Sequence, residues 1–253
     1  MKSKDKLVKS SNPLRIALIS DDMYPASGGI TRSIQTQINE LVRRGHEVTL
    51  IAPQYNLEQP ANCETIVMPS IYISGMPAQS CFIRQSQRTA RRICRRHQFD
   101  IIHSQTERGG LALAARIAKL QNIPHVHTFH GNLAGSHDSQ PFTAAWGSLA
   151  YIFLISPVIS LIAKKQHNQP VHLAPKSPDA TRLLARFDWR SMANVASRVD
   201  IFTAPADFMI QRITECVGNL SIPSRTIPTG INPELSRAIS QAKRHRSDNT
   251  IRF

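Results

Sequence analysis

The chain has 253 residues, enough for one large domain or two small ones, and its hydrophobic content of 41% supports a buried core. Lysine and arginine outnumber the acidic residues by 31 to 17, which gives a formal net charge of +14. This balance favours an anionic partner, such as a phosphate, a nucleic acid or an acidic membrane surface. The four cysteines form no C-x-x-C pair, which excludes a paired-cysteine site and indicates free thiols in a reducing cytosol. Residues 1–13 are basic and lack an apolar core, so we expect a flexible tail and not a signal peptide.

The stretch from Leu14 to Pro53 reads as a strand–helix–strand unit. An apolar run at 14–20 predicts a strand buried on both faces, and a second such strand is expected at 48–52. Between them, Gly28 and Gly29 open a helix that begins near residue 30. Backbone N–H groups at such a helix start attract anions, and glycine lets a bulky ligand approach the main chain. The pair does not fit G-x-G-x-x-G, so a dinucleotide fingerprint is not supported, and a plain tight turn is the alternative.

A basic amphipathic helix is predicted from Phe82 to His97, after a short strand at 64–68. Six arginines are expected to share one side of it: Arg84, Arg88, Arg91, Arg92, Arg95 and Arg96. One interpretation is an ordinary solvated face. The other is an anionic partner, with membrane lipid ahead of nucleic acid, because six like charges repel one another unless an anion is present.

The next elements predict the fold class. A strand at 99–103, a helix at 111–121 and a strand at 124–128 continue the alternation of strands and helices. This pattern predicts an α/β fold with a Rossmann-like parallel sheet and helices on both faces. Ligands of such sheets bind beyond the carboxyl ends of the strands, so we expect 21–29, 103–107 and 129–131 to converge around the binding site.

Two side chains at these strand ends are candidates for chemistry. His130 lies just past a strand, where an imidazole can bond a sugar hydroxyl or a phosphate oxygen. Glu107, in HSQTERGG, could position a hydroxyl or serve as a base, or it could simply cap the following helix. His125 and His127 share one face of their strand, and packing is the interpretation that we favour for them. No Cys or carboxylate stands at metal-ligand spacing nearby, so no metal is expected.

The segment Pro141–Ala163 is uncharged over its whole length. By length it could just span a bilayer. Three interpretations stay open: a helical hairpin that is buried or covered by a partner, an interfacial element that dips into a membrane, and a true span. Beyond it we expect a helix at 180–197, a strand at 200–204, a helix from Pro205 to Cys216, a strand at 224–227 and a final basic helix at 234–246.

With these residues in view, the chain resembles the N-terminal domain of a family 4 glycosyltransferase of GT-B fold. Four landmarks occur in order: RIALISDDMYPASGGITRS with LVRRGHEVTLIAP, then FDIIHSQTE, then IPHVHTFHGN, then RVDIFTAPADFMIQRI with RTIPTGINPE. The combination of HSQTE with HTFH is similar to the diacylglycerol glucosyltransferase and phosphatidylinositol mannosyltransferase branch. The resemblance spans Leu14–Glu234.

The resemblance implies roles for the candidate residues. Gly28 and Gly29 match the glycine loop beside the donor diphosphate and the acceptor, and His130 matches the histidine that contacts the transferred sugar. Glu107 matches the acidic residue of the HSQTE loop. The pair Gly230 and Asn232 matches the family's "NGID" turn, although an amide replaces the final carboxylate here. The arginine helix corresponds to the amphipathic helix by which such monotopic enzymes dock on anionic bilayers.

These correspondences imply a domain at 14–235, with an apolar insertion and loop at 141–178 and a basic linker at 236–253. The implied reaction is transfer of a hexose from a UDP- or GDP-linked sugar to a lipid or lipid-linked acceptor, with retention and without cofactor or metal. The donor-binding C-terminal domain is not in this sequence, so the isolated chain is expected to show no or very weak transfer. The implied location is cytoplasmic, on the inner face of the membrane. The alternative is a non-catalytic half that docks on a membrane or on a separate chain carrying the donor domain; a nucleic-acid partner is not expected.

Overall fold

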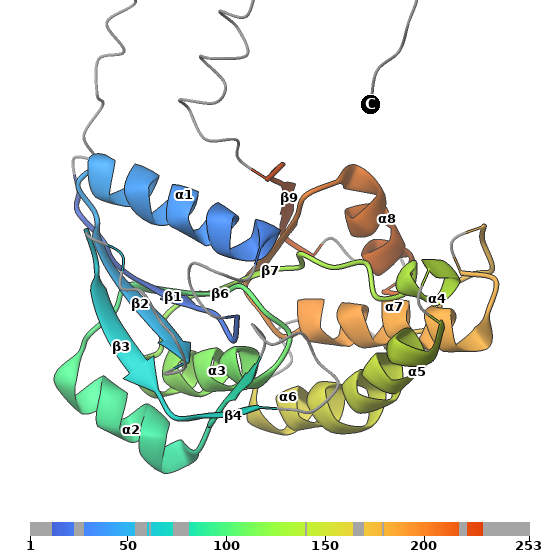
Figure 1. The fold of residues 1–253 in the computed structure, drawn as a ribbon, viewed down its shortest axis with the longest axis horizontal. Helices are drawn as coiled ribbons and strands as arrows, with labels where there is room; N and C mark the ends of the chain where they lie inside the picture. The colour runs from blue at the N-terminus through green and yellow to red at the C-terminus, as the bar shows by residue number, and fades with distance from the viewer. Residues whose placement is uncertain are drawn as a thin grey trace, which may run out of the picture.

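A computed structural model describes residues 12–22, 28–53, 60, 62–72, 81–139, 141–163, 170–178, 180–217 and 222–229. These residues build a parallel seven-stranded sheet with the order β3-β2-β1-β6-β7-β8-β9 (Figure 1). The strands are β1 (Arg15–Ile19), β2 (Glu47–Pro53), β3 (Glu64–Met68), β6 (Ile101–Ser104), β7 (His125–Thr128), β8 (Ile201–Ala204) and β9 (Ser224–Thr226). The order reverses at β1, which is the arrangement of a doubly wound α/β sheet. The predicted fold class is confirmed.

Helices cover both faces of this sheet (Figure 1). They are α1 (Gly29–Arg43), α2 (Gln87–Arg96), α3 (Gly109–Gln121), α4 (Ser136–Ser139), α5 (Pro141–Ala150), the π-helical turn η1 (Tyr151–Ile155), α6 (Ser156–Ile162), α7 (Leu183–Ala196) and α8 (Asp207–Glu215). Leu18 of β1 points into a core with Ile34 and Ile38 of α1. Its neighbour Ile19 points to the opposite face, into a core that α2 and α3 complete. This alternation explains why β1 has no polar position after its first residue: both of its faces are buried.

The predicted helix from Phe82 to His97 is wrong in its first turn. Phe82 belongs to β5 (Cys81–Ile83), which pairs in antiparallel fashion with β4 (Ser70–Tyr72), a small sheet that the sequence did not indicate. Helix α2 begins only at Gln87, because Ser86 is its N-cap and accepts a hydrogen bond from the Thr89 N–H at 3.1 Å. The arginine at position 84 therefore lies in the loop ahead of the helix.

The uncharged segment does not form the hairpin that was one of its three interpretations. It runs as one helical segment through α5, η1 and α6. Pro157 lies just after the π-helical turn, and a widened turn is where a helix can tolerate a residue that lacks an N–H donor. The part Ala144–Ile162 is long and apolar enough to cross a membrane, and 28% of it is buried against the domain. The described residues do not include Gly230, Asn232 or the predicted helix at 234–246. Of the predicted basic tail, they include only positions 12 and 13.

Candidate functional site

A buried carboxylate, Asp21, organises the edge of the sheet where the site was expected. It lies two residues beyond β1 and is fully buried. Its Oδ1 accepts a hydrogen bond from the Ile83 N–H at 2.8 Å. Its Oδ2 accepts hydrogen bonds from the Gly110 N–H at 2.7 Å and from the Thr106 hydroxyl at 2.8 Å. Asp21 therefore ties β1 to β5 and to the first turn of α3. This residue was not predicted from the sequence, although a carboxylate at the end of a buried strand was a usable signal.

The glycine pair that opens α3 makes this close packing possible. A Cβ atom added at Gly109 would lie 2.1 Å from the carbonyl oxygen of Ile83. At Gly110 it would lie 2.8 Å from Asp21 Oδ2. Any larger side chain would therefore push α3 away from β5 and from the carboxylate that caps it.

Glu107 lies in the turn between β6 and α3, and it does not cap the helix. The N-cap of α3 is Arg108, which makes no side-chain capping bond, and the Gly110 N–H is taken by Asp21. Burial raises the pKa of Glu107 to about 7, and the nearby charges of Asp22 and Asp21 act in the same direction, against Arg108. Arg108 itself pairs with Asp22. A carboxyl group with this pKa can give or take a proton at neutral pH, which suits acid–base work better than capping.

His130 is held by a chain of amide groups that begins in α1. Its Nε2 lies 2.7 Å from the side-chain Oε1 of Gln105. The Nε2 of Gln105 in turn donates to the Oε1 of Gln37 at 2.9 Å. Since an amide oxygen only accepts, His130 carries its proton on Nε2 and keeps a lone pair on Nδ1. Burial lowers the pKa of His130 to about 4, so the ring is neutral at physiological pH. Segments after β6 and β7 thus converge with α1, as the strand order predicted.

The two other histidines of β7 pack as expected. His125 Nε2 and His127 Nδ1 both lie 2.8 Å from the hydroxyl of Ser104 on the neighbouring strand β6. Both rings are buried, and burial lowers the pKa of His125 to about 3 and that of His127 well below its ordinary value. His103, on β6, bonds the Thr128 hydroxyl through Nε2 at 2.7 Å. These rings form a neutral polar layer beneath the site and leave His130 as the histidine at its edge.

The predicted anion site at the start of α1 is described only from Gly28 onward. Gly28 is the N-cap and has φ 79°, in the left-handed region that favours glycine. Space around the Cβ positions of Gly28 and Gly29 is open to 4 Å, and the first turn of α1 carries no acidic residue. The main chain at Gly28 and Gly29 therefore has room for an anionic group, but the loop that precedes it, at 23–27, and the partner turn at Gly230 and Asn232 lie outside the described residues.

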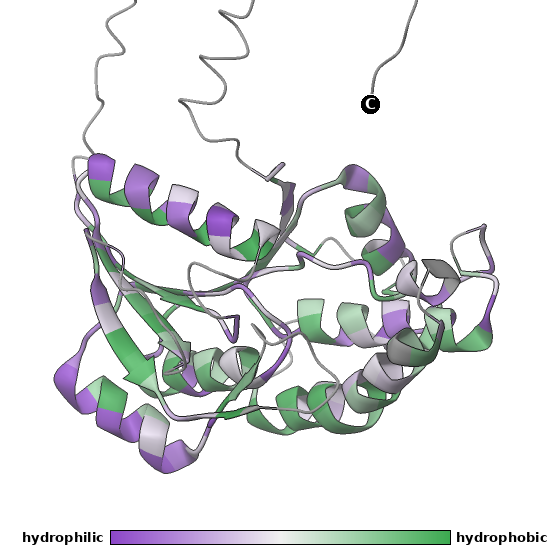
Figure 2. Ribbon diagram, viewed as in Figure 1, coloured by the Kyte–Doolittle hydropathy of each residue, from purple (hydrophilic) through white to green (hydrophobic). Residues whose placement is uncertain are grey.

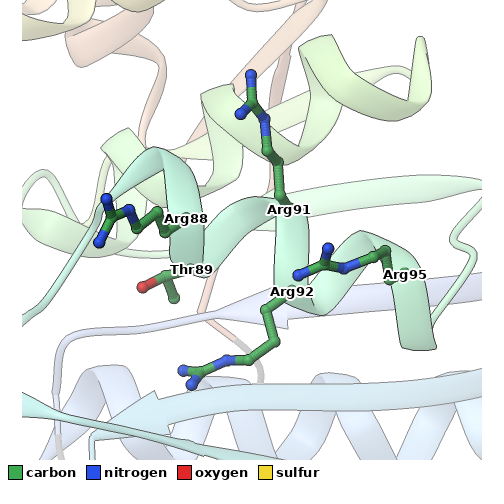
Figure 3. Close-up of a pocket in the computed structure, with 5 residues that line it drawn as sticks. All are labelled: Arg88, Thr89, Arg91, Arg92 and Arg95. Atoms are coloured by element: carbon green, nitrogen blue, oxygen red, sulfur yellow. The ribbon is translucent and has the colours of Figure 1, made fainter.

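The arginines of α2 line a cavity of about 360 Å³ together with Thr89: Arg88, Arg91, Arg92 and Arg95 (Figure 3). All four side chains are exposed, and none of them forms an ion pair with a carboxylate in the part of the chain that the structure describes. The side chains of Arg91 and Arg92 extend in different directions, but both line this one cavity, so these four arginines share a surface as predicted (Figure 3). Arg84 and Arg96 are exposed but do not line the cavity. Unpaired arginines around a hollow remain suited to an anion.

Comparison with known proteins identifies the family to which the chain belongs. The model of Glycosyltransferase Family 4 matches residues 27–235. The chain is 30% identical over 118 residues to the alpha-monoglucosyldiacylglycerol synthase of Streptococcus pneumoniae; this match covers 46% of the chain and 26% of that protein. Among solved structures, a sucrose-phosphate synthase from Thermosynechococcus elongatus has a TM-score of 0.43 at 13% identity, with 90% of this chain and 96% of that chain covered. UGT89C1 of Arabidopsis thaliana, solved with UDP, has a TM-score of 0.44 at 11% identity, with 92% and 56% covered. Because the family model matches most of the chain, this protein belongs to glycosyltransferase family 4.

Proposed function

We propose that this chain is the acceptor-side half of a hexosyltransferase that moves a sugar from a nucleotide-sugar to a membrane lipid. The observation that carries the proposal is the hydrogen-bonded chain from Gln37 through Gln105 to His130, which fixes a neutral imidazole at the carboxyl edge of the sheet. The pneumococcal relative is named for the glucosylation of diacylglycerol, so diacylglycerol is the acceptor that we propose first.

In the proposed reaction, His130, the start of α1 and Glu107 have different roles. The Nδ1 lone pair of His130 accepts a hydrogen bond from a hydroxyl of the sugar being transferred. The start of α1, after Gly28, faces the diphosphate, whose negative charge grows as the bond from the anomeric carbon to the diphosphate oxygen breaks. Glu107, with its pKa of about 7, accepts a hydrogen bond from the acceptor hydroxyl and orients it toward the anomeric carbon. The acceptor oxygen forms the new bond to the anomeric carbon, its proton passes to the ionised Glu107 carboxylate, and the diphosphate leaves with the electron pair of the broken bond.

The other wall of the cleft would come from a donor-binding domain, which in the proposed enzyme is either a separate chain or a continuation of this one. We therefore expect residues 1–253 alone to give no or very weak transfer from radiolabelled UDP-glucose or GDP-mannose to diacylglycerol in vesicles. Robust turnover by the chain alone would show that no second domain is needed and would overturn this part of the proposal.

A second assay tests the function itself. The chain is fused to the part of the pneumococcal relative that follows the matched region, and transfer to diacylglycerol is measured with the same donors. The expected result is glycolipid formation that is lost in His130→Ala and kept in His172→Ala, a matched change of an exposed histidine. A folded fusion that binds UDP but forms no glycolipid with any of these donors contradicts the proposed function.

A further inference from the structure

The helical segment α5–η1–α6 presents a continuous apolar surface to solvent. Phe142 is 86% exposed, Trp146 75%, Phe153 69% and Leu161 85%. The full set, which we call the apolar ridge, is Phe142, Trp146, Leu149, Phe153, Leu154 and Leu161. Most of its members follow one another at three- or four-residue spacing or multiples of it, and such residues lie along one side of a helix. Figure 2 shows this hydrophobic run along α5 and α6. Exposed aromatic side chains in such number on one element mark an interaction surface.

The opposite side of the same segment is fastened to the domain by polar contacts. The Ser148 hydroxyl donates to Asp188 Oδ2 at 2.7 Å, inside a fully buried cluster that also includes His137. Farther along, Asn194 Nδ2 donates to the Ser156 hydroxyl at 2.7 Å. Pulling the segment into hydrocarbon as a span would strip these polar groups of their partners, which is costly. The segment therefore lies along the surface of the domain and offers only its outer side.

The surroundings of the apolar ridge indicate the kind of partner. Helix α3 packs against both α2 and α6, so the arginine cavity and the apolar ridge belong to the same helical layer on one side of the sheet (Figure 1). The apolar ridge carries no charge, and the arginines beside it are exposed and lack carboxylate partners among the described residues. Apolar and aromatic side chains flanked by basic ones match the acyl boundary and the phosphates of an anionic bilayer.

We infer that the apolar ridge is a membrane-inserting element, which lies in the plane of an anionic bilayer beside the arginines of α2. This deepens the proposed function and rests on it for one consequence, the route of the acceptor. Tyr151, on the inner side of the segment, is buried, and its hydroxyl has no hydrogen-bond partner among the described residues. Burial raises the pKa of the Tyr151 hydroxyl, and the negative charges of Glu107 and Asp188 raise it further. Tyr151 also packs in one core cluster with Phe129, the neighbour of His130, so this segment adjoins the candidate site and a lipid acceptor would reach Glu107 along it.

The chain contains its own reporter for a test. Trp146 is on the apolar ridge, whereas the other tryptophan, Trp189, is fully buried. We expect Trp146 emission to shift to the blue on mixing with phosphatidylcholine–phosphatidylglycerol vesicles, and brominated acyl chains to quench it. Replacing Phe142, Phe153 and Leu161 by serine should lower partitioning roughly tenfold or more, because three large apolar side chains no longer enter the bilayer. The matched control is Phe208→Ser, a 47% exposed phenylalanine on α8, which should partition like the parent chain.

Three results would overturn the inference. The first is a folded chain, by circular dichroism, that does not bind anionic vesicles. The second is binding that the triple serine variant retains in full. The third is sedimentation showing a dimer that the serine changes dissociate while vesicle binding is unchanged, which would assign the apolar ridge to a second copy. None of these measurements requires transfer: vesicle binding without glycolipid formation by the fusion would refute the proposed function and leave the membrane-inserting element standing.

Discussion

The ionisation of Glu107 gives the sharpest test of the site, because it can be measured on the chain without any substrate. The folded protein holds the proton of this carboxyl up to a pH of about 7, whereas the ordinary value is 4.5. Between these two pKa values the folded state carries one proton more than the unfolded state. Glu107 therefore contributes stability that is complete below pH 4.5 and is lost as the pH rises through about 7.

The size of this loss follows from linkage. One bound proton changes the free energy of unfolding by about 1.4 kcal/mol for each pH unit. From pH 5.5 to 7.5 the contribution of Glu107 should therefore fall by about 2 kcal/mol. In Glu107→Gln the side chain cannot titrate, so the free energy of unfolding of the parent minus that of the variant should fall by this amount over the same window.

Urea unfolding followed by circular dichroism at half-unit pH steps measures the difference directly. Taking the difference between the two chains removes the contributions of all other groups that titrate in this window. Gln98→Ala, which changes an exposed side chain that carries no titratable group, should give a difference that is flat with pH. If the difference between the parent and Glu107→Gln also stays constant within about 0.5 kcal/mol, the carboxyl does not hold its proton near neutral pH and the reasoning is refuted.

Three further outcomes are expected. Because burial lowers the pKa of His125 to about 3, the folded state lacks the proton that the unfolded state binds below pH 6.5. The free energy of unfolding of the parent minus that of His125→Gln should therefore fall by about 1.4 kcal/mol from pH 7.5 to pH 5.5 in urea titrations, and a constant difference would contradict this. Gly109→Ala should cost about 1–3 kcal/mol in the same assay because its Cβ would meet the backbone oxygen of Ile83, whereas Gly29→Ala, in open space, should not destabilise. Gln105→Glu should raise the pKa of His130 by about 1–3 units in an NMR titration, since a carboxylate then faces Nε2; an unchanged value would break the proposed contact.

The sheet could be read from the sequence because its signals are local. The apolar run of β1 is visible in five consecutive residues, and the helical spacing of apolar residues in α1 is visible within fifteen. Both signals can therefore be recognised without knowing which distant residues they contact. The strand order then placed His130 and Glu107 at one edge without further information. The helix predicted at 111–121 was found as α3, although its start at the glycine pair Gly109 and Gly110 depends on the close approach of β5.

What the sequence did not reveal depends on partners far along the chain. Asp21 accepts hydrogen bonds from the N–H groups of Ile83 and Gly110, which lie 62 and 89 residues away in the sequence. No local sequence pattern predicts such a contact. No role was predicted for Gln105 within HSQTE, yet its amide links α1 to His130. The same limit applied to the uncharged segment from Pro141: composition alone left three interpretations, and only the contacts of its inner side distinguish a surface helix from a membrane span.

The arrangement of the two helical layers gives the proposed reaction a direction. Helix α1, whose N-terminus is the proposed diphosphate site, packs on one face of the sheet through Ile34 and Ile38. The apolar ridge and the arginine cavity belong to the layer on the other face, with α3. A water-soluble nucleotide-sugar and a lipid would therefore approach the carboxyl edge from opposite sides, and His130 and Glu107 stand where the two routes meet. In the proposed enzyme, the apolar ridge would keep the acceptor side of the cleft against the membrane, so that the lipid would react in the bilayer plane without being extracted into water.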